Sequence, residues 1–182
     1  MAKSIWTLDP HHTLIEFSAK HMMITTVKGR FDVATGQVEG ELPDLTGASV
    51  HVAVDLNSVT TGDEKRDEHL RSADFFDVEH FGEMTFVSKQ IRRTDENEYA
   101  VTGDLTIRGV TREIVLNATF DGQVKSPWGQ DVAAITVEGK LNRKDWGLNW
   151  NVALEAGGIL VSEQVKIAVH AELIRQPVPA SV

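Results

Sequence analysis

Asp9, His11 and His12 form the best cluster of side chains that could hold a metal ion, since imidazole and carboxylate groups both bind zinc. Adjacent residues on a strand point to opposite faces, so His11 and His12 cannot easily bind one ion together. We therefore expect these residues to stabilise a turn, with His12 hydrogen-bonded across a corner of the chain. The sequence predicts neither a metal site nor a cofactor.

Catalysis would need a nucleophile, a general base and an orienting group. Ser, His and Asp all occur, but cysteine is absent and neither G-x-S-x-G nor H-E-x-x-H is present. The pattern favours a protein without a chemical step of its own.

Two charged residues, Arg143 and Glu163, occupy positions at which the alternation of their segments places apolar residues. A lone buried charge is costly, so we expect the two to pair near one end of the fold. Alternatively, these residues lie at an opening of the fold, contact a ligand head group, or are shifted in register by a bulge.

The stretch from Thr61 to Phe81 is the one long break in an otherwise alternating β pattern. Thr61 and Glu64 fit a capping box, which predicts a helical excursion over about residues 62–81. The neighbouring rings of Phe75 and Phe76 cannot both be comfortable in water, so at least one plugs an apolar opening. The stretch therefore predicts a lid.

Polar residues of this lid have two interpretations. Ion pairs among them hold the lid in place, which we favour, or they contact a ligand head group directly. The residues concerned are Arg66, Asp67, His69 and Arg71.

Most of the remaining chain alternates apolar and polar residues with period two. Val50, Val52 and Val54 share a face of the clearest strand, and the last strand is predicted from Ile159 to Leu173. About eight such strands, joined mostly by short turns, predict an all-β, eight-stranded antiparallel barrel. Such a barrel is either filled by side chains or holds one small ligand, and the lid favours the second.

Met22, Met23 and Ile24 interrupt this alternation at a strand end. Adaptable thioether side chains in that position either line an apolar pocket or fill the core, and we favour core filling.

Length and charge limit the classes of function. A chain of 182 residues suits one domain, predicted over residues 1–176 with a frayed tail at 177–182. A net charge of −9 argues against nucleic acid and anionic membrane surfaces as partners. No run is long enough to span a membrane and the N-terminus has no apolar signal region, so a cytoplasmic location is expected for the chain as given. A homodimer and a removed signal peptide stay open.

Several motifs together resemble the YceI-like family of lipocalin-like polyisoprenoid-binding proteins. They are WTLDPHHTLIEFSAKHM at 6–22, VKGRF at 27–31, KRDEHLRSADFFDVEHF at 65–81, GDLTIRGVTREIVL at 103–116 and NRKDWGL at 142–148. The resemblance implies a lipocalin-like barrel whose elongated interior holds a polyisoprenoid or another long-chain amphiphilic lipid, with the helical excursion near the opening.

The expected function is non-catalytic binding, storage or transport of such a lipid. An enzyme acting on an isoprenoid lipid and a solidly packed, stress-related structural protein are the alternatives, and an internal void would argue against the packed barrel. The candidate ligand-binding residues are Ile15, Phe17, His21, Met23, Phe31, Val52, Val54, Arg66, His69, Leu70, Phe75, Phe76, Phe81, Met84, Phe86, Leu105, Ile107, Arg143, Trp146 and Glu163.

Overall fold

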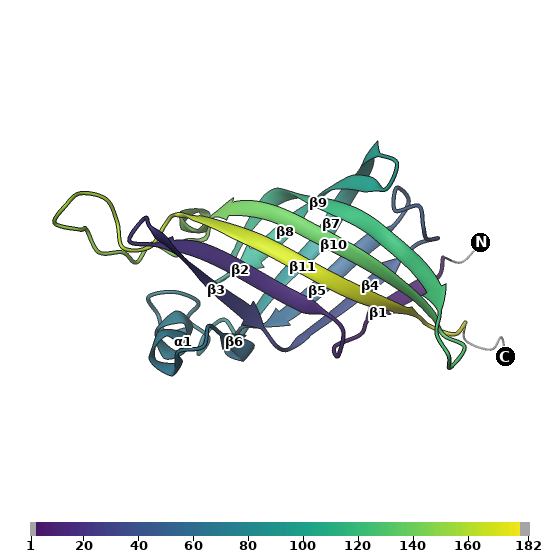
Figure 1. The fold of residues 1–182 in the computed structure, drawn as a ribbon, viewed down its shortest axis with the longest axis horizontal. Helices are drawn as coiled ribbons and strands as arrows, with labels where there is room; N and C mark the ends of the chain where they lie inside the picture. The colour runs from purple at the N-terminus through teal and green to yellow at the C-terminus, as the bar shows by residue number, and fades with distance from the viewer. Residues whose placement is uncertain (1–2, 179–182) are drawn as a thin grey trace.

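The computed structural model describes residues 3–178, and its strands form one antiparallel sheet (Figure 1). The elements in chain order are β1 (Ile5–Leu8), β2 (Leu14–His21), β3 (Thr25–Phe31), β4 (Ala34–Glu39), β5 (Ser49–Asp55), η1 (Leu56–Ser58), β6 (Val59–Thr60), α1 (Glu64–Arg71), β7 (Glu83–Asp95), β8 (Glu98–Ile107), β9 (Val110–Lys125), β10 (Asp131–Asn142), η2 (Arg143–Trp146) and β11 (Gln164–Arg175).

Eight of the strands described within residues 3–178 pair in a closed ring. The ring runs β1, β4, β5, β7, β8, β9, β10 and β11, and β11 pairs back to β1. Closure removes the open edges that an ordinary sheet would expose. The predicted eight-stranded antiparallel barrel is therefore confirmed.

The barrel differs at its two ends because one edge of β11 pairs with two strands in succession. Residues 166–170 of β11 pair with β2, and residues 173–175 pair with β1. β2, β3 and β6 therefore form a branch that leaves the ring near the start of β11. Figure 1 shows α1 and β6 beside this end, which we call the lid end, with β1 toward the opposite, far end.

The alternation in the sequence predicts which strand faces point inward. Val52 and Val54 of β5 line the interior of the barrel together with Ile167 and Val169 of β11. These residues lie two apart in the sequence, so all of them share the inner face of their strand. The inward faces of both strands are as predicted.

The last strand begins later than expected, at Gln164 rather than Ile159. Residues 152–160 turn back on themselves instead: Ala153 bridges Ile159, and the Leu160 amide donates to the Val152 carbonyl over 2.9 Å. We call this segment the apex hairpin. Two glycines with positive φ, Gly157 and Gly158, allow the chain to reverse here.

The corner between β1 and β2 is closed by the residues that resembled a metal site. One Asp9 carboxylate oxygen accepts from the His11 amide at 2.9 Å, and the other lies 2.8 Å from His12 Nδ1. Glu172 of β11 approaches the same His12 nitrogen at 3.9 Å. The expected turn-stabilising role is confirmed, although the hydrogen bond of His12 is to Asp9 within the turn and not across the corner.

The predicted helical excursion contains α1, but its first turn is capped differently from the prediction. Asp63 is the N-cap, and its Oδ1 accepts from the amides of Lys65 and Arg66. The Thr61 hydroxyl instead donates to Asp67 at 2.6 Å. The capping-box assignment was wrong because Asp63, an equally good cap, lies directly before the helix.

In the part of the chain that the structure describes, no helix combines the length and the apolar character needed to cross a membrane. The frayed tail predicted for 177–182 falls outside the described residues from position 179 onward.

Candidate functional site

The barrel encloses two cavities with apolar walls. The first, of about 170 Å³, lies in the middle of the barrel and is lined by Val52, Val54, Phe86 and Leu105 among others. The second, of about 130 Å³, lies under the lid. We call them the inner cavity and the lid cavity. Both are lined by Ile15, Met84 and Ile167, so the two spaces are neighbours separated by the same side chains.

Aromatic rings close the lid cavity on the side of α1. Phe76, which follows the helix, packs edge-on against Phe31 of β3 with ring centroids 5.8 Å apart. Phe31 in turn lies 5.3 Å from Phe17 of β2. All three rings line the cavity, so one surface serves both as plug and as pocket wall.

A second aromatic group joins the lid to the loop that follows η2. His69 of α1 and Phe75 lie 4.5 and 5.5 Å from the ring of Trp150. The His69 Nε2 atom also lies 2.9 Å from Asp74 Oδ2, which fixes the orientation of the imidazole. Trp150 was not among the predicted residues, because no alternation places it on a strand.

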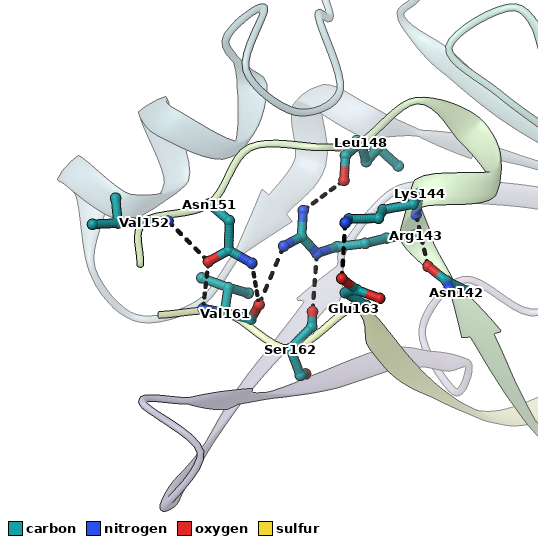
Figure 2. A network of polar contacts seen from close by, with 9 residues as sticks. All are labelled: Asn142, Arg143, Lys144, Leu148, Asn151, Val152, Val161, Ser162 and Glu163. Atoms are coloured by element: carbon teal, nitrogen blue, oxygen red, sulfur yellow. Dashed lines mark hydrogen bonds and ion pairs between the residues drawn. The ribbon is translucent and has the colours of Figure 1, made fainter. Parts of the chain in front are cut away.

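Buried Arg143 lies where the lid cavity meets the loop between η2 and β11, and only 5 % of it is exposed. Its Nε donates to the Ser162 carbonyl at 2.9 Å, Nη1 to Leu148 at 2.5 Å and Nη2 to Val161 at 3.2 Å. Figure 2 shows the guanidinium between the two ends of this loop. Burial lowers the pKa of Arg143, and the Glu163 carboxylate opposes that shift.

The expected Arg143–Glu163 ion pair does not form. Glu163 instead pairs with Lys144, with 2.8 Å between Oε1 and Nζ, and this hydrogen bond lowers the pKa of the exposed carboxyl. The alternation of a strand applies to neither residue, because η2 begins at Arg143 and β11 begins only after Glu163. The prediction of a buried charge was therefore correct for Arg143 and wrong for Glu163.

Three of the four lid residues expected in ion pairs have neutral partners, and the fourth, His69, has the acidic partner Asp74. Arg66 donates to the Thr61 hydroxyl and carbonyl at 2.7 and 2.8 Å, and Arg71 donates to the carbonyls of Asn57 and Val59. Buried Asp67 accepts from the Thr61 amide and hydroxyl. The ion-pair interpretation is therefore wrong for Arg66, Asp67 and Arg71, whose partners lie in the chain before the helix. His69 alone has an acidic partner.

Fourteen of the predicted residues line one or both cavities: Ile15, Phe17, Phe31, Val52, Val54, Leu70, Phe75, Phe76, Met84, Phe86, Leu105, Ile107, Arg143 and Trp146. Six others lie elsewhere among the described residues: His21, Met23, Arg66, His69, Phe81 and Glu163. Phe81 packs against Gly109 in the β8–β9 turn, where an added Cβ would lie 2.9 Å from its ring.

The core-filling interpretation of Met22, Met23 and Ile24 is wrong. They form the β2–β3 turn, and Met23 and Ile24 are 62 % and 76 % exposed. The sequence shows only that these residues are apolar and break the alternation. It does not show that the hairpin extends past the strands that could have covered them.

Other lining residues were missed, although a signal for them was present. They include Ile114, Leu116, Ala118, Ile135, Val137, Val165, Ile167, Val169, Ala171 and Leu173. All continue the period-two pattern on the inner faces of β9, β10 and β11. Together with the predicted residues, they give the barrel two adjoining cavities with apolar walls.

The chain matches the YceI-like domain family over residues 6–173. A UPF0312 protein of Staphylococcus epidermidis is 41 % identical over 168 residues, which cover 92 % of this chain and 95 % of the relative. A UPF0312 protein of Staphylococcus aureus strain MSSA476 is 39 % identical over the same shares.

Solved structures share the fold. The YceI protein of Campylobacter jejuni is 27 % identical, with a TM-score of 0.76 over 87 % of this chain and 90 % of that one. BcnA of Burkholderia cenocepacia has a TM-score of 0.77 at 21 % identity, over 91 % and 98 % of the two chains. A polyisoprenoid binding domain from Saccharophagus degradans has a TM-score of 0.67 at 18 % identity, over 94 % and 98 %.

Proposed function

Because the chain belongs to the YceI-like domain family, we propose that it binds a polyisoprenoid or another long-chain amphiphilic lipid inside the barrel and stores or transports it without a chemical step. The observation that carries this proposal is the pair of neighbouring apolar cavities beneath an aromatic lid. A solidly packed structural barrel would not need them.

The sizes of the cavities determine how such a ligand enters. At about 170 and 130 Å³, each is smaller than the ~300–1,000 Å³ of typical ligand pockets. A long chain therefore has to occupy both, which requires the shared side chains to move. Met84 suits this role, because its thioether side chain adapts its shape more readily than the branched side chains of Ile15 and Ile167.

Both cavities suit the apolar chain of an amphiphile, because almost all of the surface that lines them belongs to apolar atoms. The Arg143 guanidinium beside the lid cavity is held by backbone carbonyls. Like this chain, the polyisoprenoid binding domain of Saccharophagus degradans folds as a barrel of this type, which supports the same class of ligand here.

Native mass spectrometry of the purified protein, followed by lipid extraction, tests the proposal. We expect a bound lipid that is lost from Ala118→Leu, which fills part of the inner cavity. Ala134→Leu makes the same change on the exposed face of β10 and should retain the lipid. Equal lipid content in both variants, or none in the wild type after incubation with prenyl lipids, would contradict the proposal.

A further inference from the structure

Two neighbouring loops carry exposed apolar side chains at the lid end of the barrel. The β2–β3 turn presents Met23 and Ile24, and the apex hairpin presents Val152, which is 47 % exposed. The loops touch: Gly158 packs so closely against Met23 that a Cβ there would collide with the sulfur. We call residues 22–24 and 152–160 together the apolar tip. In Figure 1 both loops project beyond the strands at the same end.

The apex hairpin satisfies part of its own backbone. The Leu154 amide donates to Gly158 at 3.1 Å and the Gly157 amide to Leu154 at 3.0 Å, in addition to the bond from Leu160 to Val152. Peptide groups that lack partners cannot enter hydrocarbon without a large penalty. These internal bonds therefore lower the cost of moving the hairpin from water into the surface of a bilayer.

The base of the tip is held rigidly. Arg143 binds carbonyls at both ends of the loop, and Asn151 Nδ2 donates to the Val161 carbonyl at 2.7 Å (Figure 2). Met22 and Met23 hold positive φ values of 50° and 64°, in a turn where Asn and Gly are favoured. Apolar side chains are thus kept exposed in a backbone conformation that suits them poorly, which indicates a use for them outside the fold.

Charge and shape identify the partner. Glu155 is the one charged residue in the tip, on a protein of net charge −9, so the tip fits a surface without net charge. Protein partners need about 800 Å² of complementary surface on each side and favour Trp, Tyr and Arg, which this narrow projection lacks. A bilayer requires only that an apolar tip protrude.

We propose that the apolar tip inserts into the surface of an electrically neutral lipid bilayer and docks the protein there. The Val161 and Leu148 side chains next to the tip also line the lid cavity, so docking places the lid end of the barrel against the membrane. Docking requires only the exposed tip and does not depend on a lipid inside the barrel.

Flotation with phosphatidylcholine vesicles, using protein stripped of lipid, tests the proposal. We expect the wild type to float with the vesicles, with little effect of added salt, and the double variant Ile24→Ser/Val152→Ser to partition about tenfold more weakly. Trp128→Ser is the matched control, because Trp128 is 84 % exposed in the β9–β10 turn at the far end. It should float like the wild type.

Wild-type protein that remains in the vesicle-free fraction would overturn docking, even if it still binds prenyl lipids in detergent. Equal flotation of the wild type and the double variant would overturn it as well. Ala156→Asp places a charge on an exposed position of the hairpin and should also abolish flotation, so the conclusion does not depend on one set of variants. Circular dichroism verifies that each variant is folded.

Discussion

The guanidinium of Arg143 donates to carbonyls from both ends of one loop, which explains how a cation is accommodated beside an apolar cavity. All three of its nitrogens are engaged by the backbone. The guanidinium also lies over the Phe75 ring, with 5.9 Å between Cζ and the ring centroid. At the scale of single residues, this buried charge holds two separate stretches of backbone together.

Replacing Arg143 by Leu should lower the free energy of unfolding by about 2–4 kcal/mol, because the carbonyls of Leu148 and Ser162 lose their donor. Glu163→Leu should change stability little, since that carboxylate is exposed and pairs with Lys144. Urea denaturation of both variants and of the double variant should show additive effects. Strong recovery in the double variant would mean that the two residues form a buried pair after all.

The Asp9–His12 and Asp77–His80 contacts predict a small dependence of stability on pH. A hydrogen bond to the carboxylate raises the pKa of each His above the ordinary 6.5. The contribution is therefore fully present below pH 6.5 and is lost as the pH rises through the raised value. NMR titration should show that Asp9→Asn returns the His12 pKa toward 6.5. Asp77→Asn should do so for His80 alone, and an unchanged His12 pKa in Asp9→Asn would contradict the assignment.

At the scale of elements, the inner faces of the strands were predictable, whereas the detailed course of the segments between them was predictable only in part. Val52 and Val54 identify the inner face of β5, because side chains alternate with a period of two in every strand and this does not depend on the neighbouring strands. The start of β11 was misplaced because the apolar residues of the apex hairpin imitate a strand. The exposure of Met23 depends on how far the β2–β3 hairpin extends past neighbouring strands. The residues close to Met23 in the sequence do not reveal this.

The same limit applies to the site. The phenylalanines of the lid cavity were found because the lid interrupts a regular pattern. Trp150 was missed because its contact with Phe75 joins two irregular segments far apart in the sequence. Arg143 was placed in the interior correctly, but its partners are backbone carbonyls, which no sequence pattern distinguishes.

Phe76 and Phe75 provide a matched test of the lid. Phe76 is half-buried over the lid cavity, so Phe76→Ser should weaken lipid retention more than it lowers the melting temperature. Phe75 is buried against Trp150 and Arg143, so Phe75→Ser should cost about 3–5 kcal/mol. Thermal unfolding and the rate of lipid release measure the two effects. Early unfolding of Phe76→Ser with lipid still bound to the folded fraction would make Phe76 a core residue and not a gate.

At the scale of the whole molecule, the barrel is closed by strand pairing while its interior is divided. The ring of eight described strands fixes the walls, and the lid end is where the branch of β2, β3 and β6 leaves the ring. The lid, the lid cavity and the apolar tip lie at this end, and the inner cavity adjoins the lid cavity through shared lining residues. Under the proposed function, a ligand that enters here meets the lid cavity first and the inner cavity second.

This order predicts how affinity depends on the length of a prenyl chain. Each buried CH₂ can contribute up to ~0.8 kcal/mol, so affinity should rise with length and level off once both cavities are filled. Titrations that follow tryptophan emission can measure this, and affinity that is indifferent to length would count against a deep apolar site.

Met84, which lines both cavities, should set the length at which affinity levels off. Met84→Phe enlarges the side chain between the cavities and should stop the gain at shorter chains, where only the lid cavity is filled. Met84→Leu nearly conserves the volume and should keep the dependence of the wild type. If Met84→Phe shows the same length dependence as Met84→Leu, then the chain does not pass from one cavity to the other, and the ligand occupies the lid cavity alone.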